Sequence, residues 1–120
     1  MVRVLVVDDD KDLLEMIIIM LRANRMEVKS LSGGTALFET LATETPDILL
    51  MDIFLGDSDG RELCKQVKKS TAYHRLPVLL YSAGEIAAAS IADSNADHFL
   101  RKPFEMTHLI SQIRARVKQK

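Results

Sequence analysis

Five short apolar runs, separated by segments with helical spacing, constrain the fold of this chain more than any other feature. The runs cover residues 3–7, 27–31, 48–51, 77–81 and 98–101. The second run alternates weakly, whereas the first, third and fourth are almost entirely apolar, as is typical of strands covered on both faces of a parallel sheet. We therefore predict five short strands that lie in one parallel sheet.

The segments between these runs carry apolar residues three and four positions apart, which is the spacing of an amphipathic helix. The predicted helices cover residues 11–25, 36–45, a short segment around Leu63 and Val67, 85–92 and 105–120. In the first of them we expect Leu13, Ile17 and Met20 to face the sheet. Strands that alternate with helices form right-handed βαβ units, so we predict an α/β fold with helices on both faces of the sheet.

Composition and charge restrict the function classes. The chain has 120 residues, of which 48% are hydrophobic and 28% charged, as is ordinary for a globular domain, and we expect residues 1–120 to form one domain. The formal net charge of -1 gives no global field that would attract nucleic acid or anionic lipid. We therefore expect no direct binding to nucleic acid and no membrane association.

Export and membrane insertion are also not expected. The longest apolar run, residues 16–21, is far too short to span a bilayer. The single cysteine, Cys64, has no partner for an internal disulfide, which favours a reducing compartment and an unreactive thiol. We expect a cytoplasmic protein.

Polar side chains follow four of the five predicted strands. Asp8 and Asp9 follow the first, Asp52 the third, Ser82 the fourth and Lys102 the fifth. The carboxyl ends of parallel strands meet at one edge of the sheet, so these side chains should lie close together. Three carboxylates at such distances repel one another by several kcal/mol per close pair unless a cation neutralises them. Oxygen ligands without His or Cys favour Mg²⁺, with Mn²⁺ possible, over zinc.

A simpler interpretation is that an acidic residue after a strand only caps the next helix, as Asp10 or Asp12 can do. A single strand end of this kind would carry little weight. Four strand ends that bear acid, acid, hydroxyl and amine favour a shared site.

Four motifs in this order make the whole chain resemble a receiver domain of a two-component response regulator, of the chemotaxis type with a single domain. They are VLVVDDD at 4–10, ILLMD at 48–52 followed by DG at 59–60, YSA at 81–83 and ADHFLRKPF at 96–104. The resemblance implies a flavodoxin-like three-layer (βα)5 sandwich whose five-stranded parallel sheet has the order 2-1-3-4-5. It also implies a cis peptide between Lys102 and Pro103.

For the site, the resemblance implies that Asp52 accepts a phosphoryl group from a phosphohistidine of a sensor histidine kinase or a histidine phosphotransfer protein. It implies that Asp9 and Asp52 bind Mg²⁺ directly, that Asp8 acts through a metal-bound water, and that the Phe54 backbone carbonyl supplies a further ligand. Such a protein assists its own phosphoryl transfer and hydrolysis, but it is not a conventional turnover enzyme.

For the response, the resemblance implies that Ser82 and Lys102 hold phosphoryl oxygens and that Ser82 and Phe99 form the switch. Output would then change on the face formed by residues 85–120. The implied partner is a downstream protein or a linked effector domain, and the implied state is a monomer or a phosphorylation-dependent dimer.

Several interpretations compete with or extend this one. The chain could be an interaction module that works without phosphorylation, or a metal-dependent phosphatase or other enzyme of similar fold, although no glycine-rich phosphate loop follows the first strand. Phe54, two residues after the acceptor, either slows hydrolysis of the acyl phosphate or only packs in its loop. Leu14 and Ile18 are candidates for contact with a kinase, with a local apolar bulge or a dimer surface as the alternatives.

Overall fold

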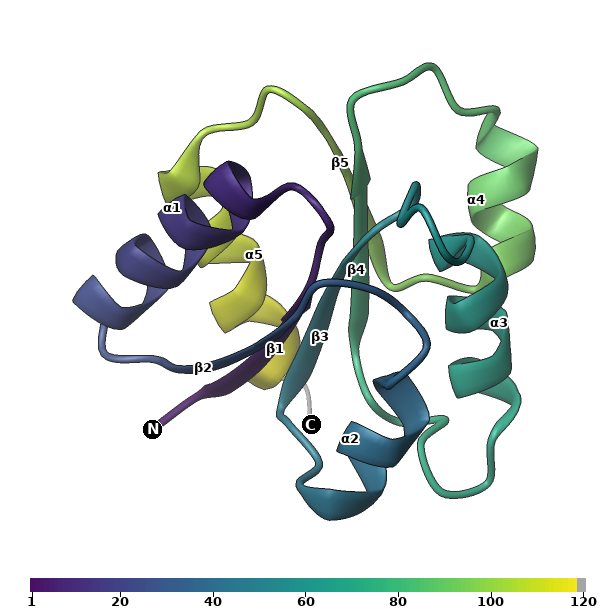
Figure 1. Cartoon of the computed structure of the whole chain (residues 1–120), viewed down its shortest axis with the longest axis horizontal. Helices are drawn as coiled ribbons and strands as arrows, with labels where there is room; N and C mark the ends of the chain where they lie inside the picture. The colour runs from purple at the N-terminus through teal and green to yellow at the C-terminus, as the bar shows by residue number, and fades with distance from the viewer. Residues whose placement is uncertain (119–120) are drawn as a thin grey trace.

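One parallel sheet with the strand order β2-β1-β3-β4-β5 runs through the centre of the protein (Figure 1). The computed structural model describes residues 1–118 of the chain. The strands are β1 (Arg3–Val7), β2 (Glu27–Leu31), β3 (Ile48–Asp52), β4 (Val78–Ser82) and β5 (His98–Arg101). All four strand pairs are parallel, which confirms the predicted sheet and its order.

Helices cover both faces of the sheet, as predicted. They are α1 (Lys11–Ala23), α2 (Leu37–Thr43), α3 (Gly60–Lys69), α4 (Ala88–Ser94) and α5 (Met106–Lys118). Figure 1 shows α1 and α5 on one side of the sheet and α2, α3 and α4 on the other. The three-layer α/β fold is therefore confirmed.

Alternate side chains of the central strands fill the two interfaces between sheet and helices. Val4 and Val6 of β1 belong to the apolar cluster under α1 and α5, whereas Leu5 and Val7 belong to the cluster under α2 and α3. Successive side chains of a strand point to opposite faces, so a strand covered on both sides must be apolar at every position. This requirement explains why β1, β3 and β4 appear in the sequence as continuous apolar runs.

Helix α1 differs from its prediction in which face it buries. Its buried residues are Leu14, Ile17 and Leu21, whereas Leu13 and Met20 are only partly buried. The helix contacts α5 as well as the sheet, so its buried stripe is rotated by about one residue from the predicted one. The proposal that Leu14 is a partner contact is wrong for this reason, while Ile18 stays partly exposed.

The ends of α1 are set by local interactions. The Asp10 carboxylate accepts hydrogen bonds from the backbone N–H groups of Asp12 and Leu13, both at 3.2 Å, so Asp10 is the N-cap and the cap interpretation holds for this residue. The helix stops at Ala23, two residues before the predicted end, and Arg25 adopts a left-handed conformation with φ 64°.

Helix α4 begins at Ala88 and ends at Ser94, although residues 85–92 were predicted to be helical. The alanine-rich segment carries no side chain that caps its start. Its end is better defined, because the Ser94 hydroxyl donates to the Ile91 carbonyl at 2.6 Å and Asn95 is left-handed at φ 62°. Helix α5 begins one residue later than predicted, and residues 119–120 of that prediction lie outside the described residues.

Candidate functional site

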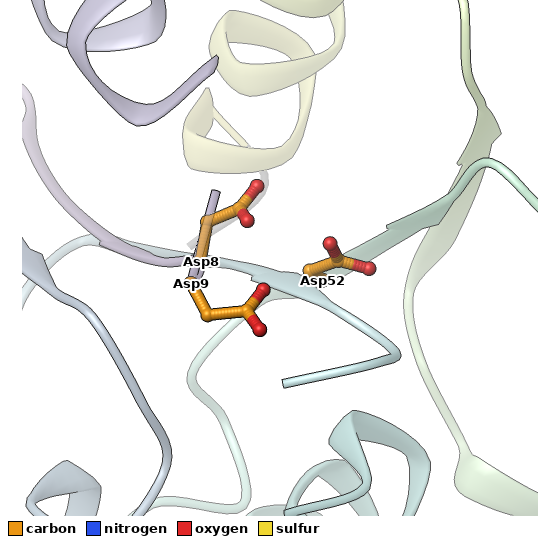
Figure 2. Close-up of side chains that lie close together, drawn as sticks. All are labelled: Asp8, Asp9 and Asp52. Atoms are coloured by element: carbon orange, nitrogen blue, oxygen red, sulfur yellow. The ribbon is translucent and has the colours of Figure 1, made fainter. Parts of the chain in front are cut away.

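The carboxyl ends of β1 and β3 bring three carboxylates together at one edge of the sheet (Figure 2). Asp8, Asp9 and Asp52 each place a carboxylate oxygen within 4.8 Å of the other two. Asp8 and Asp52 are buried and Asp9 is exposed. The predicted cluster of acidic side chains is therefore present, and it opens to solvent on the side of Asp9.

Lys102 supplies the positive charge of this cluster. Its ammonium Nζ lies 3.1 Å from Asp52 Oδ2 and 3.8 Å from Asp8 Oδ2. The residue follows β5, where its backbone N–H donates to the Ser82 carbonyl at 2.8 Å and its peptide bond to Pro103 is cis. One ammonium balances one of the three carboxylates, so net negative charge remains on this edge of the sheet.

Asp8 is held by two hydrogen bonds in addition to this ion pair. The backbone N–H of Asp10 donates to Asp8 Oδ1 at 2.8 Å, and the Tyr81 hydroxyl donates to Asp8 Oδ2 at 2.8 Å. Burial raises the pKa of Asp8, and these hydrogen bonds together with Lys102 oppose that rise. Burial also raises the pKa of Tyr81 well above its usual value, so its hydroxyl remains a donor.

The hydrogen bond from Tyr81 to Asp8 was not predicted from the sequence, in which Tyr81 stood only as part of a strand and a motif. The signal was nonetheless present. A tyrosine inside a fully buried strand needs a hydrogen-bond partner for its hydroxyl, and the nearest unpaired polar groups were the carboxylates predicted at the same sheet edge.

Ser82 and Phe99 do not belong to the acidic cluster. Ser82 ends β4 and is buried, and its Oγ accepts the backbone N–H of Gly84 at 3.2 Å. Phe99 lies on β5 and packs, partly buried, against the apolar cluster on the side of α2 and α3. The roles predicted for these two residues stay predictions.

The loop after β3 is shaped by close backbone approach. A Cβ on Gly60 would collide with the Asp52 carbonyl oxygen, which explains the glycine of the DG motif. Asp59 caps α3 by accepting the Arg61 N–H at 2.8 Å. The backbone N–H of Phe54 donates to Asp52 Oδ1 at 3.2 Å, and the residue as a whole is 54% exposed.

The donor set fits a hard divalent cation. Three carboxylates converge, and no His or Cys belongs to the cluster that the described residues form. Such oxygen ligands suit Mg²⁺ and Mn²⁺, and the excess negative charge of the cluster attracts a divalent cation. The exposed position of Asp9 leaves an open side through which an ion could enter.

Comparison with known proteins identifies the family. The model of the response regulator receiver domain matches residues 4–114, so this chain belongs to the response regulator receiver family. Receiver domains are phosphoacceptors rather than conventional enzymes, and they interact with histidine kinases. The acidic triad is typical of the Mg²⁺ site of this family, and together with Lys102 it is consistent with phosphoaspartate signalling.

Individual relatives agree with this assignment. The response regulator MprA of Mycobacterium ulcerans (strain Agy99) is 34% identical over 116 residues, which cover 95% of this chain and 49% of that protein. A protein from Chloroflexus aurantiacus J-10-fl, crystallised as a response regulator, superposes with a TM-score of 0.91 at 29% identity, covering 98% of both chains. The receiver domain of Francisella response regulator 1452 gives a TM-score of 0.89 at 26% identity, covering 99% of this chain and 98% of that one.

The chain spans about half the length of the curated relatives it matches. Among residues 1–118, no helix is both long and apolar enough to cross a membrane.

Proposed function

We propose that this chain is a phosphorylation-activated receiver in which Asp52 accepts a phosphoryl group from a phosphohistidine of a sensor histidine kinase or a histidine phosphotransfer protein. One observation carries the proposal. Of the triad carboxylates, that of Asp52 makes the shortest ion pair with the Lys102 ammonium, at 3.1 Å, and it lies within 4.8 Å of the other two. A nucleophile in that position meets the cation partners that phosphoryl transfer requires.

The reaction proposed for Asp52 is a displacement at phosphorus. A carboxylate oxygen of Asp52 forms the new P–O bond as the P–N bond to the donor histidine breaks, and the electron pair of that bond stays on the imidazole nitrogen. Lys102 and Ser82 would hold phosphoryl oxygens, Lys102 through its charge and Ser82 through its hydroxyl. The product is an acyl phosphate, which serves as the signal.

Asp9, Asp52 and the Phe54 backbone carbonyl would hold Mg²⁺, or Mn²⁺ in its place, with Asp8 acting through a metal-bound water. A bound divalent cation supplies neutralisation of the charge on the transferred group. Asp8 suits an indirect role because it is the most buried of the three carboxylates, with none of its surface exposed.

The response proposed here uses Ser82 and Phe99. The Ser82 hydroxyl would turn from the Gly84 N–H toward the phosphoryl group, and the partly buried Phe99 ring would move inward behind it. The face formed by α4, β5 and α5 would then change its contacts with a downstream protein or a linked effector domain, as a monomer or as a phosphorylation-dependent dimer.

Two finer features belong to the same proposal. A cytoplasmic location is proposed because receiver domains typically work there. Two organisations are open to a receiver of this kind, a receiver alone as in the chemotaxis type and a receiver linked to an effector domain, and the curated relatives are about twice as long as this chain. Sequencing the native open reading frame distinguishes these two organisations.

The experiment that tests the proposal is intact mass spectrometry after incubation with acetyl phosphate, with and without Mg²⁺. The wild type should gain one phosphoryl group only when Mg²⁺ is present, and Asp52→Asn should gain none. Absence of any gain in the wild type would contradict the proposal and favour an interaction module that works without phosphorylation.

A further inference from the structure

Phe54 lies at the rim of the acceptor site, where its backbone N–H donates to Asp52, and the residue is more than half exposed. Phe54 follows Asp52 by two residues, and its ring reaches toward the loop after β4. A Cβ built on Gly84 would lie 3.5 Å from Phe54 Cε2, and the Gly84 N–H donates to Ser82 Oγ. The ring therefore lies between the loops that carry the proposed acceptor and the proposed switch hydroxyl.

An exposed ring on a loop needs a second contact to stay in one place, and Arg61 provides it. The guanidinium carbon of Arg61 lies 5.7 Å from the centroid of the Phe54 ring. This distance is within the range of a cation–π contact, which extends to about 6 Å. The ring is thus bounded by Gly84 on one side and by a cation on another.

Arg61 is itself held on three sides of its guanidinium group. Its Nε donates to Asp59 Oδ1 at 3.0 Å, its Nη2 to Asp59 Oδ2 at 2.7 Å, and its Nη1 to Ser90 Oγ of α4 at 3.0 Å. A bidentate fork of this kind fixes the plane of the guanidinium group in a way that a lysine could not. A rigid cation can position the ring that stacks on it.

We propose that Arg61 is a positioning residue that holds the Phe54 ring across the mouth of the acceptor site and thereby lengthens the life of the phosphoryl group. The inference rests on the proposed function of Asp52 as acceptor. Hydrolysis requires a water oxygen to attack phosphorus while the P–O bond to Asp52 breaks, which regenerates the carboxylate and releases inorganic phosphate. An apolar ring fixed at the rim restricts the approach of that water.

The test compares hydrolysis of the acyl phosphate in wild type, Arg61→Gln, Phe54→Ala and the double variant, each phosphorylated with acetyl phosphate and then freed of donor. Both side-chain changes leave the Phe54 carbonyl in place. Arg61→Gln should hydrolyse about two- to fivefold faster, the range that a cation–π contact at an exposed site can supply. The double variant should match Phe54→Ala, because Arg61 acts only through the ring.

Lys65→Gln is the matched control. Lys65 also joins α3 to α4, through Asp93 at 2.6 Å, and it pairs with Glu62 of its own helix at 3.8 Å. Its variant should keep the wild-type lifetime. An unchanged phosphoryl lifetime in Arg61→Gln would overturn the proposal. So would an equal effect of Arg61→Gln on the lifetime in the wild type and in Phe54→Ala, or an effect of Lys65→Gln as large as that of Arg61→Gln.

A second measurement needs no phosphoryl group. The chain contains no tryptophan, so Phe54→Trp introduces a single indole at the rim of the site. Adding Arg61→Gln should increase the quenching of this indole by acrylamide, whereas adding Lys65→Gln should not; equal quenching in all three proteins would overturn the positioning contact. If the wild type accepts no phosphoryl group, the function proposed for Asp52 fails, and quenching still supports or overturns the contact between Arg61 and residue 54.

Discussion

At the residue scale, the charge of the acidic triad is the feature with the clearest energetic consequence. Three carboxylates with one nearby ammonium carry excess negative charge, and the two buried ones cannot be fully screened by water. The arrangement favours cation binding at the expense of stability in the metal-free protein. Lower stability without the ligand is characteristic of residues that serve ligand binding and not the fold.

Asp9, the exposed member of the triad, allows both the stability of the metal-free protein and its affinity for Mg²⁺ to be tested. Asp9→Asn should stabilise the metal-free protein by about 1 kcal/mol, because it removes one charge from a repelling group, and should weaken Mg²⁺ binding at least tenfold. Urea unfolding in EDTA measures the first effect and calorimetric titration with Mg²⁺ the second. A loss of metal-free stability in this variant would show that Asp9 has a structural role.

Cys64 provides a prediction about pH. Its thiol is buried in α3, and burial raises its pKa to about 11 from an ordinary value of 9.0. The unfolded thiol therefore ionises first, the native state holds the proton more tightly, and stability is lost as pH rises from about 9 to about 11. We expect this loss to reach roughly 2 kcal/mol.

Urea unfolding of the wild type and of Cys64→Ala isolates the contribution of the thiol. The measurements are made at several pH values from about 8 to about 10.5, the range in which free thiols ionise. The difference in unfolding free energy between the two proteins should shrink as pH rises. Parallel curves would contradict the prediction, since other groups that titrate in this range are common to both proteins.

At the element scale, the end of α3 is joined to the starts of β4 and β5 by one ion pair. Lys68 Nζ donates to the Leu76 carbonyl and to Asp97 Oδ2, both at 2.9 Å, and the same Asp97 oxygen accepts the Val78 N–H at 2.7 Å. These contacts connect segments that are far apart in the sequence. They fix where the helix ends relative to two strands of the sheet.

Replacing Lys68 should lower the free energy of unfolding more than replacing its neighbour Lys69. Lys68→Met should destabilise the protein by about 1–2 kcal/mol, because a backbone carbonyl and a carboxylate each lose a partly buried donor. Lys69→Met, on the exposed face of the same helix, is the control and should change stability by less than about 0.5 kcal/mol. Chemical denaturation of the two variants makes the comparison, and equal effects would refute it.

At the scale of the whole molecule, residues from strands that are distant in sequence form one ligand site. Asp8 and Asp9 follow β1, Asp52 ends β3, and Lys102 follows β5. A cation that binds the native triad but not the unfolded chain must stabilise the entire fold by mass action. The same logic applies to a phosphoryl group on Asp52.

Thermal unfolding should therefore depend on Mg²⁺. The gain in stability should be about 2.7 kcal/mol when the free Mg²⁺ concentration is 100 times the dissociation constant. It should be strongly reduced in Asp9→Asn and Asp52→Asn, as measured by calorimetry across a titration of Mg²⁺ at constant ionic strength. Equal stabilisation of all three proteins would indicate a general salt effect and not binding at the triad.

Much of the fold could be predicted because it depends on patterns within short segments. The apolar runs at β1, β3 and β4 must be apolar at every position to be covered on two faces, and the start of α1 depends on the nearby cap Asp10. The strand order came from resemblance to the receiver family and not from periodicity, which does not specify which strands are neighbours. The triad followed from a general rule, since the carboxyl ends of parallel strands meet.

Short-range patterns in the sequence thus predicted the five strands, the helical segments between them and the polar side chains that follow four of the strands. The packed fold was needed to show which face α1 buries, where α4 begins, that Tyr81 donates to Asp8, and that Arg61 connects Phe54 to α4. The physical reason is the separation along the sequence of the residues that interact. Strand and cap signals arise among residues a few positions apart, whereas these contacts join residues as many as 73 positions apart, and they form only after the helices have packed on the sheet.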